Sequence, residues 1–161
     1  MKKKVLIISI IVLIIDALSK LFCDLLLNLN EPVKIINNFF NITYVHNEGA
    51  AWSILSGQRF ILILISLIAI IFLYKYLNDF KENKRNIIAF GLLFGGIFGN
   101  LYDRLFLGYV RDFLDFNIFG YNYPIFNISD ICIFIGTILI IIACIKGEDY
   151  GSSRKNKYSH R

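Results

Sequence analysis

Four long apolar runs, separated by short polar stretches, constrain this chain more than any other feature. They cover approximately residues 5–29, 60–77, 87–107 and 130–146. A helix needs roughly 20 apolar residues to cross the hydrocarbon core of a bilayer, so the short fourth run must end close to both interfaces. Hydrophobic residues make up 57% of the 161 residues, more than the roughly 45–50% of a soluble domain. The sequence therefore predicts four transmembrane helices in one membrane-embedded domain over 1–161.

The first run shares features with a cleaved signal peptide, because lysines at 2–4 precede it and the small residues Ala17 and Ser19 lie within it. Two features favour a retained helix instead. Asp16 interrupts the apolar stretch, and apolar residues resume after it. The residues before Cys23 also suit a lipoprotein processing site poorly. We therefore expect the first run to remain as a transmembrane helix.

The basic residues are distributed unevenly along the chain, which has a formal net charge of +5. With both termini in the cytoplasm, 12 of the 17 Lys and Arg residues fall in the inner segments, in agreement with the positive-inside rule. These residues are Lys2, Lys3, Lys4, Lys75, Lys81, Lys84, Arg85, Lys146, Arg154, Lys155, Lys157 and Arg161. The tail over 147–161 is then a basic anchor near anionic lipid, and we expect no nucleic-acid partner.

Two outer segments join the helices, over 30–59 and 108–129. The first has β-branched and aromatic residues at 33–36 and 39–45, which favour short strands, and a turn pattern at Asn47–Gly49. The second is rich in Asp, Asn, Tyr and Phe, and we expect it to form an interfacial loop. The predicted fold class is an all-α polytopic membrane protein with four transmembrane helices, a small extracytoplasmic β-rich cradle and this interfacial loop.

The third apolar run contains three closely spaced glycines, Gly95, Gly96 and Gly99. Small residues in membrane helices let neighbouring backbones approach each other. They also leave room for lipid chains. Close helix packing is the more usual of these two roles, and we expect it here.

Ionisable residues gather where the third and fourth runs meet the outer surface. Asp103 and Arg104 lie near the end of the third run, Asp112 follows in the outer segment, and Asp130 begins the fourth run. Charged groups at membrane depth are costly and usually functional. Two carboxyl groups that share one proton suit aspartic proteolysis, in which the ionised group takes a proton from water and the protonated group polarises the scissile carbonyl.

The helix start at the fourth run suggests how the two carboxyl groups divide these roles. Asn127 stands three residues before Asp130, a spacing that predicts a capping-box arrangement. The positive end of the helix favours an ionised carboxylate in its first turn. Our hypothesis is that Asp130 is the more readily ionised member of the pair and that Asp112 holds the shared proton.

Each of these residues also has a simpler structural interpretation. Asp130 is a common type of helix cap. Asp103 and Arg104 are suited to an interfacial salt bridge. Asp16 and Lys20 lie four residues apart on one helix face, where they either neutralise each other as a structural ion pair or support a polar site between helices.

Other chemistries lack their motifs. The chain has no His-Glu-x-x-His, no Gly-x-Ser-x-Gly and no phosphate-binding glycine loop. Cys23, Cys132 and Cys144 lie in apolar runs without metal-ligand spacing and are interpreted as small hydrophobic side chains. His46 is the one histidine outside the tail, and we interpret it as structural. We therefore expect no metal site and no disulfide framework.

Four blocks of sequence carry a resemblance to a known family. They are Asn47–Ser53 (NEGAAWS), Gly99–Arg104 (GNLYDR), Val110–Phe113 (VRDF) and Phe126–Asp130 (FNISD). In this order they resemble lipoprotein signal peptidase (signal peptidase II), a membrane aspartic protease family. The resemblance implies that Asp112 and Asp130 are catalytic. It implies that the substrate-binding residues are Asn47, Asn100, Arg104 and Asn127, and that the supporting residues are Asp16, Lys20, Gly49 and Asp103.

The same resemblance implies a substrate and a location. The substrate is expected to be a prolipoprotein whose lipobox cysteine already carries diacylglycerol, with cleavage just before that cysteine. No metal or cofactor is expected, the partners are substrates and membrane lipids, and the protein is expected to be a monomer. The expected location is the bacterial cytoplasmic membrane, with both termini in the cytoplasm and the active site at the outer face.

Two other functional classes are compatible with parts of the pattern. A small proton- or cation-coupled carrier would use intramembrane carboxylates, but carriers usually have internal repeats and sites near the bilayer midplane. This chain has no evident repeat, and its polar cluster lies near one surface. A non-catalytic assembly subunit is the second alternative, and it would tolerate Asp112→Asn and Asp130→Asn.

Overall fold

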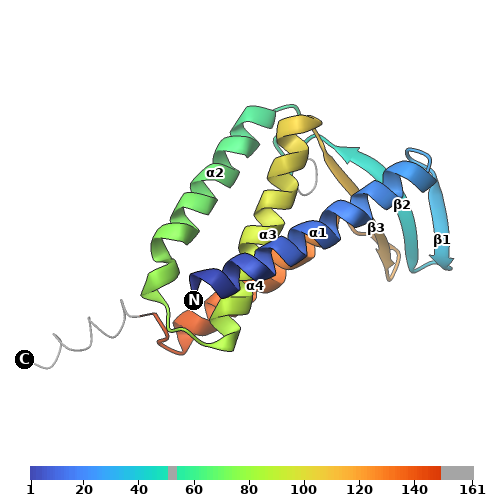
Figure 1. The fold of residues 1–161 in the computed structure, drawn as a ribbon. Helices are drawn as coiled ribbons and strands as arrows, with labels where there is room; N and C mark the ends of the chain where they lie inside the picture. The colour runs from blue at the N-terminus through green and yellow to red at the C-terminus, as the bar shows by residue number, and fades with distance from the viewer. Residues whose placement is uncertain (51–53, 150–161) are drawn as a thin grey trace, which may run out of the picture.

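A computed structural model of the chain describes residues 1–50 and 54–149 (Figure 1). The sequence block at 51–53, which belongs to the first motif, lies outside the described residues, and so does the predicted basic tail from 150 onward. The described residues form four α-helices, α1 (Lys2–Leu26), α2 (Arg59–Tyr76), α3 (Lys84–Phe106) and α4 (Ile128–Ile145). All four are long and apolar enough to cross a membrane, which confirms the prediction of four transmembrane helices.

Helix α3 lies at the centre of the bundle, with α1 and α4 packed against it (Figure 1). In its most apolar stretch 72% of the residues are buried, compared with 28% in α1, 22% in α4 and 11% in α2. Lipid-facing helices of a small bundle expose apolar side chains outward, so the low burial of the other three is expected. The central position of α3 places its polar C-terminal end where α1 and α4 both reach it.

Glycines on α3 allow this close packing. A β-carbon added at Gly95 would lie 2.6 Å from the β-carbon of Val12 on α1, and one added at Gly96 would lie 2.5 Å from the backbone oxygen of Ser129 on α4. Gly99 faces the Asp16 carboxylate in the same way. These distances are too short for a side chain, so the packing interpretation of the three glycines is confirmed.

A four-stranded antiparallel sheet projects from the bundle beyond the end of α1 (Figure 1). Its strands, in spatial order, are β1 (Pro32–Ile36), β2 (Phe40–Asn47), β3 (Val110–Ile118) and β4 (Tyr121–Asn122). The expected strands of the first outer segment are β1 and β2. The sheet thus joins two segments that are distant in sequence, and the pairing of Val45 with Asp112 places β2 beside the polar residues of β3.

Two expectations for this region need correction. The second outer segment is not an interfacial loop alone, because β3 and β4 occupy much of it, and the class all-α is therefore too narrow. The polar residues of β3 hid the pattern typical of a strand in the sequence. The apolar residues of β3 are packed on partners from elsewhere in the chain, such as Phe113 against Tyr44 and Cys23, and Phe116 stacks on Phe40 at 4.6 Å between ring centroids. Pairing with β2 therefore decides the conformation.

The close contact at Gly96 leads to a stability prediction. We expect Gly96→Ala to lower the free energy of unfolding by about 1–3 kcal/mol, because the added methyl group meets a backbone oxygen that cannot rotate away. Chemical denaturation in detergent micelles measures this. Ala17→Val, which adds methyl groups at an exposed position on α1, is the control. Equal stability of the Gly96→Ala variant and the parent protein would contradict the packing account.

Candidate active site

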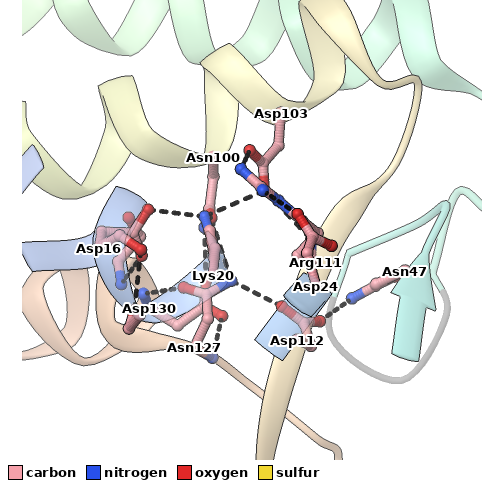
Figure 2. Close-up of polar contacts among 12 residues, drawn as sticks. Asp16, Lys20, Asp24, Asn47, Asn100, Asp103, Arg111, Asp112, Asn127 and Asp130 are labelled. Atoms are coloured by element: carbon pink, nitrogen blue, oxygen red, sulfur yellow. Dashed lines mark hydrogen bonds and ion pairs between the residues drawn. The ribbon is translucent and has the colours of Figure 1, made fainter. Parts of the chain in front are cut away.

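A fully buried lysine organises the end of the helix bundle that lies next to the sheet. Lys20 of α1 has 0% of its surface exposed, and its Nζ lies 2.7 Å from Asp16 Oδ2 and 3.2 Å from Asp103 Oδ2. It also donates a hydrogen bond to Asn100 Oδ1 at 3.0 Å (Figure 2). A buried ammonium group is stable only when it is paired and hydrogen-bonded. The two interpretations of Asp16 and Lys20 are therefore combined, because the ion pair also supports a wider polar site.

Asn100 connects this ion cluster to Asp130. Its Nδ2 donates to Asp130 Oδ1 at 2.7 Å, while its Oδ1 accepts from Lys20. Asp16 also reaches the start of α4, because its Oδ1 accepts a hydrogen bond of 2.9 Å from the backbone N–H of Ser129. The polar end of α1 and the N-terminus of α4 are thus tied together through buried groups (Figure 2).

Asn127 bridges the two carboxyl groups. Its Nδ2 donates to Asp112 Oδ1 at 2.6 Å and to Asn100 Oδ1 at 3.1 Å. Its Oδ1 accepts from the backbone N–H of Asp130 at 3.0 Å, and its own N–H donates to Asp130 Oδ2 at 3.1 Å. The predicted capping box at the start of α4 is confirmed. One asparagine therefore contacts both members of the carboxyl pair.

Asp112 is buried at the start of β3, with 1% of its surface exposed. Its second carboxyl oxygen accepts from Asn47 Nδ2 at 2.7 Å. Burial, reinforced by the negative charge of Asp130, raises the pKa of Asp112 from 3.8 to about 7, although hydrogen bonds from Asn47 and Asn127 oppose the shift. Asp112 is therefore the kind of carboxyl group that can hold a proton near neutral pH.

A cavity of about 580 Å³ opens beside Asp112. Its lining includes Asn47, Gly49 and Asp112 from the segments around β2 and β3, and Pro124 and Ile125 from the stretch before α4. Among the polar residues described above, Asn47 and Asp112 line this cavity, whereas Lys20, Asn100 and Asp130 do not. A substrate bound in the cavity would therefore meet Asp112 directly.

Arg104 of α3 holds the start of the loop that follows Asn47. Its Nη2 donates to the backbone oxygen of Gly49 at 3.0 Å, and the Gly49 N–H donates to Asn47 Oδ1 at 2.9 Å. The interpretation of Asp103 and Arg104 as a salt bridge is wrong, because Asp103 instead pairs with Lys20 and Arg111. Among the described residues, no carboxylate lies within ion-pair distance of the Arg104 guanidinium.

All ten residues singled out from the sequence lie in this one region. They come from α1, α3, α4 and its N-cap, β2, β3 and the loop after β2: Asp16, Lys20, Asn47, Gly49, Asn100, Asp103, Arg104, Asp112, Asn127 and Asp130. Over residues 1–50 and 54–149, no group of three or more His, Cys, Asp or Glu side chains has an arrangement that could hold a metal ion.

Two charged residues of the site were not identified from the sequence. Arg111 lies between Asp103 and Asp24, with its Nη2 2.8 Å from Asp103 Oδ1 and its Nη1 2.6 Å from Asp24 Oδ2. Helical spacing could have identified Asp24 as a member of the site, because Asp24 follows Lys20 by four residues and Asp16 by eight, on one face of α1. Arg111 could not be identified in this way, because its role depends on β3 lying against this face of α1.

Comparison with known proteins shows similarity over most of the chain. A family model described as signal peptidase (SPase) II matches residues 8–146. A lipoprotein signal peptidase of Staphylococcus haemolyticus is 44% identical, with 91% of this chain and 96% of the relative covered. One from Staphylococcus aureus is 43% identical, with 93% and 91% covered.

Two solved structures share the fold. Both are bacterial membrane enzymes determined by the in meso method. The first has a TM-score of 0.81 and 42% identity, and it covers 88% of this chain and 87% of its own. The second has a TM-score of 0.79 and 41% identity, with 88% and 92% covered. Similarity of this extent includes both the helix bundle and the sheet.

The buried position of Lys20 leads to a second stability prediction. We expect Lys20→Met to lower the free energy of unfolding by about 3–5 kcal/mol, because it leaves buried carboxylates of Asp16 and Asp103 without their shared ammonium group. Denaturant titration in micelles measures the change. Lys34→Met removes an exposed lysine of β1 and is the matched control. A Lys20→Met protein as stable as this control would show that the ion cluster is dispensable.

Proposed function

Because the chain belongs to the signal peptidase II family of lipoprotein-processing membrane proteases, we propose that it removes signal peptides from diacylglyceryl-modified prolipoproteins by an aspartic mechanism. Cleavage takes place just before the lipidated cysteine. The substrate-binding groups of the proposal are Asn47, which lines the cavity, and Arg104, which donates to the backbone of the lining residue Gly49. The single observation that carries the mechanism is the bridging of Asp112 and Asp130 by Asn127.

The charges around this pair favour one shared proton. The cluster contains five carboxyl groups, those of Asp16, Asp24, Asp103, Asp112 and Asp130, and three cations, those of Lys20, Arg104 and Arg111. With both members of the pair ionised, negative charge would exceed positive charge by two in a largely buried region. One proton on the pair halves that excess, and like-charged carboxylates held close titrate as a unit.

Asp130 is the ionised member in the proposed mechanism, and Asp112 carries the proton. Asp130 accepts hydrogen bonds at a helix N-terminus, where negative charge is favoured. It takes a proton from water as the water oxygen attacks the scissile carbonyl carbon, while Asp112 donates its proton to the carbonyl oxygen. When the intermediate collapses, Asp130 passes its proton to the departing amine, and Asp112 regains the proton from the hydroxyl group. Both carboxyl groups then return to their starting states.

The orientation of the bundle supports an active site at the outer face of a bacterial cytoplasmic membrane. The amino terminus, the turn between α2 and α3 and the end of α4 lie at one end of the molecule (Figure 1). The described basic residues of the inner segments lie at that end too. The carboxyl pair and the sheet lie at the opposite end. With the basic end in the cytoplasm, a prolipoprotein held in the outer leaflet by its acyl chains presents its cleavage site to the cavity, and one monomer contains the whole site.

The mechanism predicts that both carboxyl groups are indispensable. We expect Asp112→Asn and Asp130→Asn each to lower kcat by roughly a thousandfold or more, because neither amide can exchange the proton that its role requires. Cleavage of a diacylglyceryl-prolipoprotein by purified protein, followed by gel shift, measures this. The same polypeptide without lipid is the substrate control, and Asp115→Asn, on the same strand as Asp112, is the protein control.

Two outcomes would count against the proposal. If a folded Asp112→Asn or Asp130→Asn protein keeps full activity, that residue has a structural role, and the aspartic pair is wrong. If the wild-type protein cuts lipidated and unlipidated substrate equally well, the proposed dependence on the diacylglyceryl group is wrong. A carrier or assembly subunit would cut neither substrate.

The pKa of Asp112 predicts the pH dependence. Since this pKa is raised to about 7, Asp112 keeps its proton below that pH and loses it as the pH rises through that value. We expect kcat/KM to fall on the alkaline side with an apparent pKa near 7. Replacing Asn47 with Leu removes a hydrogen bond that lowers the pKa of Asp112, so the alkaline limb should move to higher pH. A limb that stays in place, or moves lower, would contradict the assignment of the proton to Asp112.

A further inference from the structure

Arg111 is the sequence neighbour of Asp112 on β3. Because successive side chains of a strand point to opposite faces, Arg111 points away from the cavity when Asp112 points toward it. Its guanidinium lies between two helices, with Nη2 2.8 Å from Asp103 Oδ1 of α3 and Nη1 2.6 Å from Asp24 Oδ2 of α1 (Figure 2). Arg111 therefore fastens the strand that carries Asp112 to both helices at once.

Asp103 holds the main chain of this strand as well as the side chain. Asp103 Oδ2 accepts from the backbone N–H of Arg111 at 3.1 Å and from its Nε at 3.3 Å. Asp103 has 1% of its surface exposed and Arg111 has 9%. A bidentate contact between a guanidinium group and a carboxylate fixes the orientation of the two groups as well as the distance between them. The backbone immediately before Asp112 is thus set by α3.

Asp24 also connects strand β2 to this arrangement. Its Oδ1 accepts a hydrogen bond from the hydroxyl group of Tyr44 on β2, while its Oδ2 accepts from Arg111. The Asp24 side chain is 33% exposed, so this end of the network lies at the edge of the protein. We call the four residues Asp24, Tyr44, Asp103 and Arg111 the arginine clamp. The clamp connects α1, α3, β2 and β3.

The sheet alone holds Asp112 less firmly than its other members. The pairing of β2 with β3 is irregular between Ile42 and Val45, where two residues of β2 face one residue of β3. Asp112 pairs with Val45, directly beside this irregularity. Irregularities of this kind locally disrupt the ladder of hydrogen bonds. Contacts outside the ladder are therefore needed to place the Asp112 carboxyl against a partner that lies on a helix.

We propose that Asp24 and Arg111 are positioning residues for the proteolytic reaction, which hold Asp112 in register with Asp130 without touching substrate. This inference rests on the proposed function of the carboxyl pair. Neither Asp24 nor Arg111 lines the cavity beside Asp112, so their loss should affect the chemical step more than substrate binding. A displacement of about 1 Å in a reacting group is enough to reduce a rate roughly a hundredfold.

The test compares variants of the clamp with a carboxylate of the same strand. Asp24→Asn keeps an acceptor for Tyr44 but removes the charge that faces Arg111. Arg111→Lys keeps the charge but cannot reach both carboxylates. Asp115→Asn is the control, because Asp115 accepts hydrogen bonds from Thr43 at 2.6 Å and from Asn41 at 3.2 Å on the same sheet, outside the clamp.

We expect Asp24→Asn and Arg111→Lys each to lower kcat by roughly tenfold, with KM changed by less than about twofold. The double variant should be little worse than either single variant, because both changes open the same clamp. Asp115→Asn should keep its activity. A folded Asp24→Asn protein with unchanged kcat, or one whose KM alone rises, would overturn the proposal. An equal loss of kcat in Asp115→Asn would mean that any destabilisation of the sheet lowers activity. That result would also overturn the proposal.

A second measurement is independent of activity. Hydrogen exchange followed by mass spectrometry reports on the backbone at 110–114, where we expect faster exchange in Asp24→Asn than in Asp115→Asn. Unchanged exchange there would show that the clamp does not hold the strand. The two failures are distinguishable. An active Asp112→Asn protein or an inactive wild-type protein would show that the proposed function is wrong. Unchanged exchange at 110–114 would show that only the positioning role is wrong.

Discussion

The structure of the site depends on a lysine that has no access to solvent. Lys20 pairs with Asp16 on its own helix and with Asp103 on α3, and it donates to Asn100. In a bundle whose other surfaces face lipid, each of these polar groups would be strongly unfavourable alone. Together they satisfy one another, and they force the C-terminal ends of α1 and α3 into a single arrangement. The contacts of Asp130 with Asn100 and of Asp16 with the start of α4 follow from that arrangement.

The proposed carboxyl pair combines a member on a helix with a member on a strand. Asp130 lies in the first turn of α4, inside a complete capping box. Asp112 lies on a strand, and its carboxyl group is reached by Asn47 from β2 and by Asn127 from the helix cap. Asparagine suits this task because its amide donates to a carboxylate without adding a charge. Neutral amide groups thus donate to the pair directly, and the charged Lys20 reaches it through Asn100.

The sequence was sufficient for the parts of the fold that local physics determines. Hydropathy identified the four helices, and the spacing of Asn127 and Asp130 identified the cap. The sheet was only half predicted, because β3 forms by pairing with β2, which lies more than sixty residues earlier in the chain. That missing strand also hid Arg111, whose partners Asp24 and Asp103 belong to two different helices. The salt bridge expected between Asp103 and Arg104 was wrong for a local reason, because adjacent residues on a helix point in different directions.

The central claim is that Asp112 and Asp130 share one proton near neutral pH, and infrared spectroscopy of the carboxyl groups tests it most directly. Protein labelled with ¹³C-aspartate would be compared on either side of pH 7. The account predicts one protonated aspartic acid below that pH, lost as the pH rises through about 7 and absent from Asp112→Asn. A protonated carboxyl band that persists unchanged in Asp112→Asn, or its absence from the wild-type protein at the lower pH, would contradict it.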